Sequence, residues 1–430
     1  MKKLKMCKKL LPLIFVLLLL SGCTDFMNGP WEENAPKIIT REPSITENQA
    51  GNTLEIESTN AGTEVPNIHP EITLGEENAL LHKDAQNGRY CYDVLSAKEQ
   101  LWYEDILAIL DGMCKDVILS IEGNEAVGEQ GIDKIFQCVM NDHPELFYVE
   151  GYTYTLYTYG DVLDKIAFSG SYTMDSNQRE ERLGQINQVV VECLSQISMD
   201  ASDYEKVKYV YEYLVSHTEY NQSASDNQNI YSVFVGKQSV CQGYAKATQY
   251  LLQNLGMQCT LVIGNVIGVR DEGHAWNLVK VDGQYYYVDT TWGDPSYQNT
   301  ESEQISITSL PEITYDYLCV TTEELLKTHV IHNVVPLPVC VATAANFYVM
   351  EGAYFTSYDE NRVIAFFEKG YEEGKSDVTL RCSDRSIYDA FYEQLITNQK
   401  IFNFLNSPDG VVAYAENPDK LSLTFWLVNE

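Results

Sequence analysis

Three residues whose side chains suit nucleophilic catalysis follow one another in the middle of the chain: Cys241, His274 and Asp289. A thiolate can attack a carbonyl carbon, an imidazole can move protons, and a carboxylate can orient the imidazole. Such a set would cleave an amide through a thioester. The flanking sequences are VCQGYA at 240–245, GHAWN at 273–277 and YVDTTW at 287–292. The chemistry requires secondary structure that brings the three side chains together.

The region around the cysteine is predicted to begin a helix. Ser239 and Gln242 have the spacing of a capping box, and Gly256 is a plausible helix stop. Ser239 is therefore the expected N-cap, with Cys241 at the second position of the first turn. The helix dipole favours an anion there, so the thiol should lose its proton more easily. A buried, unreactive Cys241 is the alternative; the glycine two residues later and the downstream His274 favour the reactive thiol.

The histidine and the aspartate are predicted to share one β-hairpin. The runs 273–281 and 284–292 are apolar and aromatic, and the Asp-Gly pair at 282–283 is a strong signal for a two-residue turn. In such a hairpin paired residue numbers sum to 565. His274 then lies on the same face as Asp289 and diagonal to it, at about 7–8 Å between backbones. A His274–Asp289 hydrogen bond is therefore expected.

These three motifs resemble those of the transglutaminase-like superfamily, whose Cys-His-Asp site is related to that of papain. The resemblance covers about Ser202 to Pro295. It implies that Cys241 is the nucleophile, His274 the general base and acid, and Asp289 the orienting carboxylate. It also implies an α+β fold whose core packs the nucleophile helix on an antiparallel sheet.

The group that completes the oxyanion site is left open by the sequence. The Cys241 backbone N–H is one candidate donor. Animal transglutaminases have a tryptophan before the nucleophile, but no tryptophan lies between Trp102 and Cys241. A tyrosine or an amide is expected in its place. The candidates for the cleft or the oxyanion site are Tyr220, Tyr231, Gln242, Trp276, Asn277 and Trp292.

The N-terminus is predicted to be an export signal. Residues 1–22 have five lysines, a short apolar run and small residues before Cys23, which is typical of a secretory signal peptide. The sequence around Cys23 resembles a bacterial lipobox, which implies cleavage before Cys23 and lipidation of its thiol. An uncleaved anchor is the alternative. The polar, proline-containing segment 23–87 is interpreted as a disordered tether. An extracytoplasmic, lipid-anchored protein is expected.

Beyond the tether, the chain is divided into three regions. An accessory α+β region (88–200), the catalytic core (201–335) and a small α+β domain of unknown role (336–430) are predicted. In the first, the alternating tyrosines of 146–158 indicate a half-buried strand more than a glycan-stacking surface. His329 and His332 are interpreted as ordinary surface residues.

The last domain is predicted to contain four strands and one helix. The expected strands are 353–358, 363–367, 378–382 and 421–428, and the helix lies around 387–396.

Composition limits the partners. The 430-residue chain has a formal charge of −33, and loss of the signal peptide with its five lysines gives −38. Such a chain would repel nucleic acid and anionic lipid, so the lipid on Cys23 is the expected membrane contact. Of eleven cysteines, eight remain after Cys7, Cys23 and Cys241 are set aside; they are interpreted as disulfides or buried thiols with equal weight. Zinc-like spacing is absent from the sequence, and neither a metal nor a cofactor is expected.

The predicted function is acyl transfer at the cell envelope, on peptide or glutamine amides, through a Cys241 thioester. Lysine or water could accept the acyl group, giving crosslinking or hydrolysis. A cysteine peptidase or amidase is one alternative, and a catalytically inert binding module is another.

Overall fold

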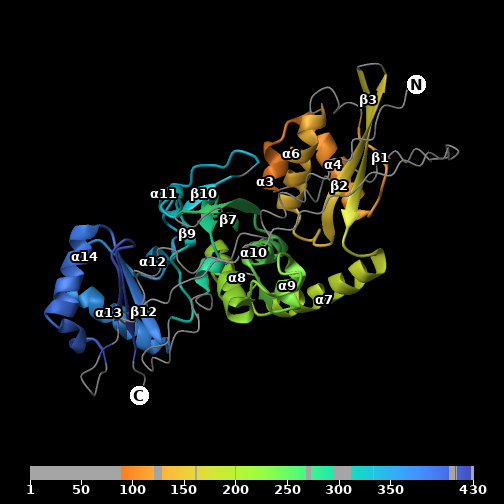
Figure 1. Ribbon diagram of the computed structural model, residues 1–430. Helices are drawn as coiled ribbons and strands as arrows, with labels where there is room; N and C mark the ends of the chain where they lie inside the picture. Colours follow the sequence, from red (N-terminus) through yellow and green to blue (C-terminus); the bar gives the residue numbers. More distant parts are fainter. Residues whose placement is uncertain are drawn as a thin grey trace, which may run out of the picture.

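The structure is a computed structural model that describes residues 89–120, 128–159, 162–198, 200–267, 273–294, 311–332, 334–405, 412 and 414–427. The predicted signal peptide, Cys23 and the tether lie outside the described residues. Within the described ranges, every helix is too short or too polar to cross a membrane. Figure 1 shows the N-terminal helices and the β2–β3 hairpin at one end, the central sheet with α8 and α10 in the middle, and α13, α14 and β12 at the other end.

The central element is a five-stranded antiparallel sheet in the order β10-β6-β7-β8-β9. Its strands are β6 (Cys259–Val266), β7 (Gly273–Val281), β8 (Gln284–Val288), β9 (Leu318–Val320) and β10 (His329–Ile331). Helix α10 (Cys241–Asn254) packs on it through Ala245, which contacts Leu261 and Ala275. The expected fold class, an α+β core with the nucleophile helix on an antiparallel sheet, is confirmed.

The β7–β8 hairpin has the predicted register. Pairing runs from Val281↔Gln284 to Asn277↔Val288, so paired numbers sum to 565. Asp282 and Gly283 have φ of 48° and 79°, the left-handed pair that a two-residue turn requires. The second strand is shorter than predicted: β8 ends at Val288, and a 3₁₀ turn occupies Thr291–Gly293.

Two helices precede α10 in the core. Helix α8 (Asp203–His217) begins with a capping box, in which Ser202 and Glu205 bond reciprocally. A short helix, α9 (Ile230–Phe234), lies between the two strands of the parallel pair β4 (Glu219–Tyr220) and β5 (Gln238–Ser239). Asn229 caps α9 by accepting from two backbone N–H groups.

The N-terminal region is α+β, as expected. Its elements are α3 (Tyr90–Val94), α4 (Ala97–Asp111), β1 (Val117–Ile118), α6 (Gly128–Asp142), β2 (Val149–Tyr159), β3 (Val162–Tyr172) and α7 (Ser176–Leu194). The strands form a sheet in the order β1-β3-β2. Tyr152 is buried and stacks on Phe168, with ring centroids 5.1 Å apart, which agrees with the structural interpretation of the tyrosine-rich strand.

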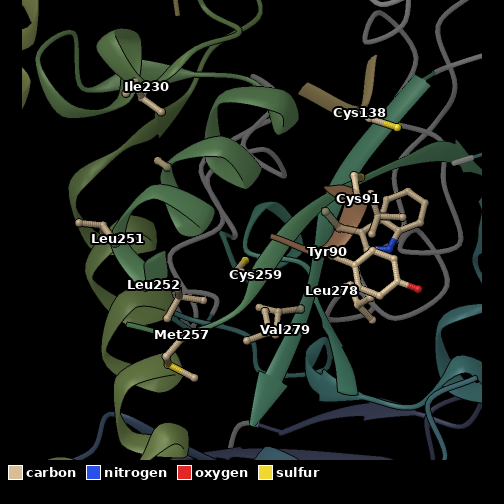
Figure 2. Packing of buried hydrophobic residues seen from close by; sticks show 14 of the residues in the cluster. Tyr90, Cys91, Cys138, Ile230, Leu251, Leu252, Met257, Cys259, Leu278 and Val279 are labelled. Atoms are coloured by element: carbon tan, nitrogen blue, oxygen red, sulfur yellow. The ribbon is translucent and has the colours of Figure 1, made fainter. Parts of the chain in front are cut away.

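One hydrophobic core joins the N-terminal region to the central sheet. Buried residues from Tyr90 to Ala353 form a single cluster. Figure 2 shows Tyr90 and Cys91 of α3 in the same cluster as Leu252 of α10 and Val279 of β7. The division at residue 200 stays a prediction, but apolar packing crosses it.

A buried carboxylate reinforces this junction. Asp142, at the end of α6, accepts from the backbone N–H groups of Cys91 and Tyr92 at 3.2 and 3.0 Å. It also accepts from the hydroxyls of Tyr103 and Thr260. Burial raises the pKa of Asp142. Because Thr260 belongs to β6, this one side chain links the N-terminal helices to the sheet of the core.

The C-terminal residues form a second core around a four-stranded sheet in the order β11-β12-β14-β13. The elements from α11 onward are α11 (Thr322–Leu325), α12 (Phe347–Met350), β11 (Tyr354–Phe355), α13 (Glu360–Glu372), β12 (Asp377–Cys382), α14 (Arg385–Tyr392), a π-helical turn (Glu393–Thr397), a 3₁₀ turn (Lys400–Asn403), β13 (Tyr414–Asn417) and β14 (Ser422–Trp426). The predicted strand 363–367 is wrong: it lies inside α13. Asp359 caps this helix, and Val363, Phe367 and Gly370 are buried at helical spacing.

The cysteines of the described residues are all free thiols, and most are buried. They are Cys91, Cys114, Cys138, Cys193, Cys241, Cys259, Cys319, Cys340 and Cys382. Of the two interpretations weighed from the sequence, the structure has the buried thiols. Cys114 is the one of these nine that is partly exposed.

Candidate active site

Cys241 is the first residue of α10, and the predicted cap is wrong. The N-cap is Val240, whose side chain cannot accept a hydrogen bond. The Ser239 hydroxyl instead lies 2.8 Å from the Ser232 hydroxyl and donates to the Asn227 carbonyl at 2.6 Å. It is therefore committed to the preceding loop. Cys241 consequently sits one position earlier than predicted, still in the first turn, where the helix dipole favours a thiolate.

The turn around Cys241 is closely packed. A Cβ atom on Gly243 would lie 1.9 Å from the Ser239 Oγ and 3.2 Å from the Asn227 carbonyl oxygen, so glycine is needed at this position. Cys241 itself is 5% exposed. This low exposure limits access to the sulfur and shields it from oxidation.

His274 and Asp289 form the hydrogen bond that the hairpin predicted. The His274 Nε2 lies 2.7 Å from the Asp289 Oδ2, and both side chains are buried. Because an ionised carboxylate only accepts, Nε2 carries the proton of this bond. The second ring nitrogen, Nδ1, is then the one that can exchange a proton with a thiol or a substrate. The Asp289 Oδ1 accepts from the Trp292 N–H at 3.2 Å, which fixes the carboxylate plane.

A second imidazole contacts the same carboxylate, and the sequence interpretation missed it. His329 was interpreted as a surface residue, which is wrong: it is 1% exposed, and its Nε2 lies 3.1 Å from the Asp289 Oδ2. Strand β10 places it there by pairing with β6, where His329 is opposite Val266. His332, one residue past the strand, is exposed as expected.

Charge and burial act in opposite directions on Asp289. Burial alone would raise its pKa, but the imidazoles of His274 and His329 hold the pKa of this carboxyl well below its usual range. Burial lowers the pKa of His329, against the opposing pull of Asp289. The site therefore contains an ionised carboxylate that accepts from two imidazole N–H groups.

Aromatic rings surround this cluster. Trp292 lies 5.9 Å from His274 and 4.6 Å from His329 between ring centroids, and Trp276 lies 5.7 and 4.8 Å from the same two rings. Both tryptophans are fully buried. A dry, aromatic environment strengthens the hydrogen bonds to Asp289 because water does not compete for them.

Two hydroxyl contacts fasten the segment after Asp289 to the nucleophile helix. The hydroxyls of Thr248 and Thr290 lie 2.8 Å apart, and the Tyr244 hydroxyl donates to Asp294 at 2.5 Å. Both partners on α10 lie within two turns of Cys241. These bonds, together with the Asn277 amide that donates to the Ala245 carbonyl at 3.0 Å, fix α10 relative to β7.

The predicted cleft residues are placed in different environments. Trp276 and Trp292 pack on the imidazoles, and Asn277 joins strand to helix. The Tyr231 hydroxyl donates to Gln185 at 2.8 Å, while Tyr220 packs near Tyr244 with ring centroids 6.3 Å apart. Gln242 is partly buried, and its Oε1 accepts no hydrogen bond from the described residues. The second oxyanion donor stays a prediction.

The two imidazoles and the carboxylate are also the group among the described residues that could hold a metal ion, since their donor atoms lie within 4.8 Å of one another. The Nε2 of each imidazole, however, already uses its proton in a bond to Asp289. A cation held by Asp289 and the two Nε2 atoms would have to displace both protons. The arrangement is satisfied as a hydrogen-bonded cluster.

Comparisons with known proteins agree with the resemblance of the motifs. The sequence model of the transglutaminase-like superfamily matches residues 193–290. Kyphoscoliosis peptidase of Mus musculus is 26% identical over 132 residues, which cover 27% of this chain and 20% of the mouse protein. The protein of the same name from Homo sapiens is 26% identical over 117 residues, 24% of this chain and 18% of its own. This chain thus spans about a fifth of the length of these curated relatives.

Solved structures with some likeness include a crystal structure of a TGase, with 17% identity, a TM-score of 0.24 and coverage of 36% of this chain and 48% of that chain. Another is a putative cysteine protease from Cytophaga hutchinsonii, with 12% identity, a TM-score of 0.23 and coverage of 35% and 68%. Through the match of residues 193–290, which contain Cys241, His274 and Asp289, this chain carries a domain of the transglutaminase-like superfamily.

Proposed function

We propose that this protein is a lipid-anchored, extracytoplasmic thiol acyl-transfer enzyme that acts on peptide or glutamine amide bonds through a thioester on Cys241. The observation that carries the proposal is the 2.7 Å bond between His274 and Asp289. His274 belongs to β7, the strand against which the Cys241 helix α10 packs. A chain that kept the fold for packing alone would not need a buried, ionised carboxylate directed at an imidazole.

The proposed reaction has two halves. The Cys241 thiolate attacks the amide carbonyl, and the resulting tetrahedral oxyanion is stabilised by the Cys241 N–H and a second donor. The C–N bond then breaks as the imidazolium of His274 gives its proton to the leaving amine, which leaves a thioester. In the second half His274 takes a proton from water or an amine, the acceptor attacks the thioester carbonyl, and the proton returns to the departing thiolate.

Asp289 keeps its negative charge throughout. Its bond to Nε2 fixes the imidazole tautomer and stabilises the imidazolium that forms in each half of the reaction. The dry surroundings of Trp276 and Trp292 favour this pairing over a solvated one.

The first experiment measures the nucleophile. The full chain, extracted with its anchor, is treated with iodoacetamide between pH 5 and 10. We expect Cys241 to be alkylated faster than a model thiol near neutral pH. Cys241→Ala should lose this fast phase, and Cys114→Ala, which removes a partly exposed thiol, should retain it. Alkylation of Cys241 no faster than a model thiol would favour the inert binding module instead.

The second experiment identifies the bond that is broken. A glutamine-containing peptide is incubated with and without a lysine-like amine. Ammonia release with incorporation of the amine indicates crosslinking, and ammonia release without it indicates deamidation. New amino termini without ammonia indicate the alternative of a peptidase or amidase. The relatives from mouse and human are both named as peptidases, so the peptidase alternative is tested alongside glutamine chemistry.

The location is part of the proposal and is tested separately. Lipidation of Cys23 and a mature charge of −38 would give a membrane-tethered protein that meets protein or peptide substrates at the cell envelope. Cys23→Ser should prevent incorporation of labelled palmitate and release the chain from the membrane fraction. A chain that stays membrane-bound without incorporating lipid would indicate the uncleaved anchor.

A further inference from the structure

We propose that His329 is a positioning residue of this site: its neutral imidazole donates from Nε2 to Asp289 and so sets the orientation and the basicity of the carboxylate that His274 uses. The proposal rests on the proposed function of Cys241 and His274. His329 lies outside residues 193–290, the segment matched by the superfamily model.

The hydrogen-bond directions around His329 follow from what each atom can do. Asp289 can only accept, so the His329 Nε2 carries a proton in its 3.1 Å bond to the Oδ2. A neutral imidazole then has an unprotonated Nδ1. That nitrogen lies 2.9 Å from the Thr328 hydroxyl, which donates to it in preference to the more distant Leu325 carbonyl at 3.4 Å. The Tyr317 hydroxyl lies 2.6 Å from the same Thr328 oxygen and can supply the next donor.

These contacts form one directed series from Tyr317 through Thr328 and His329 to Asp289. The series fixes the His329 tautomer by a hydroxyl on the far side of the ring, just as Asp289 fixes the tautomer of His274. Trp276, Trp292 and Tyr317 enclose the ring of His329, with centroids 4.6 to 5.2 Å away. These rings and the burial of His329 hold its imidazole in one orientation.

The surroundings of His329 favour its neutral form. The rings of His274 and His329 lie 5.4 Å apart between centroids, and two imidazolium groups at that distance would repel. Lys420, from the turn before β14, also faces this cluster, with its ammonium 3.8 Å from the centre of the Tyr317 ring. Asp289, His274 and Lys420 are the charged or titratable groups that act on His329. The burial of His329 and the nearby cations all favour its uncharged form.

The consequence for catalysis has two parts. A second donor on Oδ2 holds the carboxylate in place, and it also withdraws negative charge from the bond to His274. Without His329, Asp289 would be less ordered and more basic, and it would hold a proton on His274 more firmly. The first effect slows turnover, and the second extends the imidazolium form of His274 to higher pH.

The experiment uses the pH dependence of iodoacetamide alkylation of Cys241 in the full chain, which needs no knowledge of the substrate. His329→Phe keeps the ring volume and removes both nitrogens. In His329→Phe, we expect the alkaline change in the Cys241 alkylation rate, which accompanies loss of the imidazolium form of His274, to move to higher pH. Turnover of the glutamine peptide by this variant should fall roughly 10- to 100-fold, the range that one hydrogen bond to a charged group represents. His329→Gln retains an N–H donor at the place of Nε2 and should recover most of both properties.

Two further variants keep the test decisive. Thr328→Val leaves His329 in place but removes the hydroxyl that sets its tautomer, so it should shift the transition in the same direction by a smaller amount. Thr328→Val replaces His329→Phe as the test variant if circular dichroism shows that His329→Phe is unfolded. His332→Gln changes an exposed histidine three residues away and should match the unmodified chain.

The outcomes separate this inference from the proposed function. If the unmodified chain shows no enhanced Cys241 alkylation, the proposed function fails. If it shows that enhancement and the folded His329→Phe and Thr328→Val variants keep its pH profile, His329 is only a packing residue and the inference is overturned.

Discussion

The hairpins β2–β3 and β7–β8 are both antiparallel and rich in aromatic residues, yet only β7–β8 carries a candidate site. In β2–β3 the register shifts at two places, and residues 153–157 are only partly buried. β7–β8 lies between β6 and β9 in a five-stranded sheet, and its pairing is regular. Most of its residues are buried on both faces.

Burial on both faces determines how accurately a strand can place a side chain. A slip of one residue in β7 would move His274 away from Asp289 and move buried side chains to the wrong face, so the register is strongly specified. β2 is an edge strand in which a slip would cost less. A site that needs a 2.7 Å contact is therefore expected in a hairpin such as β7–β8 and not in one such as β2–β3.

The largest expected effect comes from the side chain that the β7–β8 register places. Asp289→Asn keeps the size of the side chain but can donate to the imidazole and so favour the wrong tautomer of His274. Turnover of the glutamine peptide should fall by about 10³- to 10⁴-fold, with little loss of folding. Steady-state kinetics on the purified variant would measure it. Activity within tenfold of the unmodified chain would mean that the hairpin does not serve catalysis.

The second prediction compares a glycine in each sheet. A Cβ on Gly264 of β6, opposite His274, would lie 1.8 Å from the Val330 carbonyl oxygen, whereas a Cβ on Gly170 of β3 would meet the end of the Tyr172 side chain at 2.0 Å. Backbone cannot move aside as a tyrosine can. Gly264→Ala should reduce the free energy of unfolding by about 3 kcal/mol, and Gly170→Ala by about 1 kcal/mol.

Urea unfolding of both glycine variants would measure the difference. Displacement of the Tyr172 hydroxyl, whose single proton is shared between the carbonyls of Ile109 and Cys114, would add to the smaller value. Equal losses in the two variants would contradict the claim that the central sheet is the less tolerant of the two.

A third prediction concerns the helix that covers β7. Lys246 of α10 is 8% exposed, and burial lowers its pKa to about 8. Because its pKa is lower in the folded than in the unfolded chain, folding is penalised below pH 8, and the penalty disappears as pH rises toward about 10.4. Lys246→Met should therefore stabilise the chain by about 2 kcal/mol at pH 7.

The advantage of Lys246→Met should shrink between pH 8 and 9.5, as measured by urea unfolding at each pH. Lys206, a lysine on the partly exposed side of α8, offers a matched control, and Lys206→Met is measured over the same pH range. A constant advantage at every pH would mean that the lysine is hydrated in the folded chain.

The smallest effect is expected in β2–β3. Tyr154 of β2 is partly buried and pairs with Phe168 across the hairpin. Tyr154→Thr keeps a residue suited to strands and should change the free energy of unfolding by about 1 kcal/mol or less, with no change in Cys241 alkylation. A glycan array with both proteins would test the stacking alternative. Glycan binding that Tyr154→Thr abolishes would show that this hairpin has a site of its own.

The features that were predictable from the sequence depend on residues close to one another in the chain. The two-residue turn at 282–283 fixes the register of β7 and β8, and the register places His274 near Asp289. The capping boxes at Ser96 and Ser202 are likewise local, because each joins residues three apart in the chain. The superfamily resemblance added the role of Cys241, which the local pattern alone left open.

The features that were missed depend on contacts between distant segments. His329 reaches Asp289 because β10 pairs with β6 across more than sixty residues, and nothing near His329 in the sequence indicates that pairing. Ser239 has the spacing of a cap, but its hydroxyl is hydrogen-bonded to Ser232 and Asn227 and does not cap the helix. The segment 363–367 contains residues typical of strands, yet Asp359 starts a helix before it.

The contacts of α6 with the core have a consequence for how the chain can be divided. Gln249 of α10 donates to the Asn141 carbonyl at 2.7 Å, and Thr260 of β6 donates to Asp142. A gene fragment encoding residues 193–290 alone would lose these bonds, would expose the apolar surface that the N-terminal helices cover, and would lack β9 and β10. The smallest autonomously folding unit is therefore larger than the family segment, and transplanting the chemistry to another scaffold would require the helices that precede it.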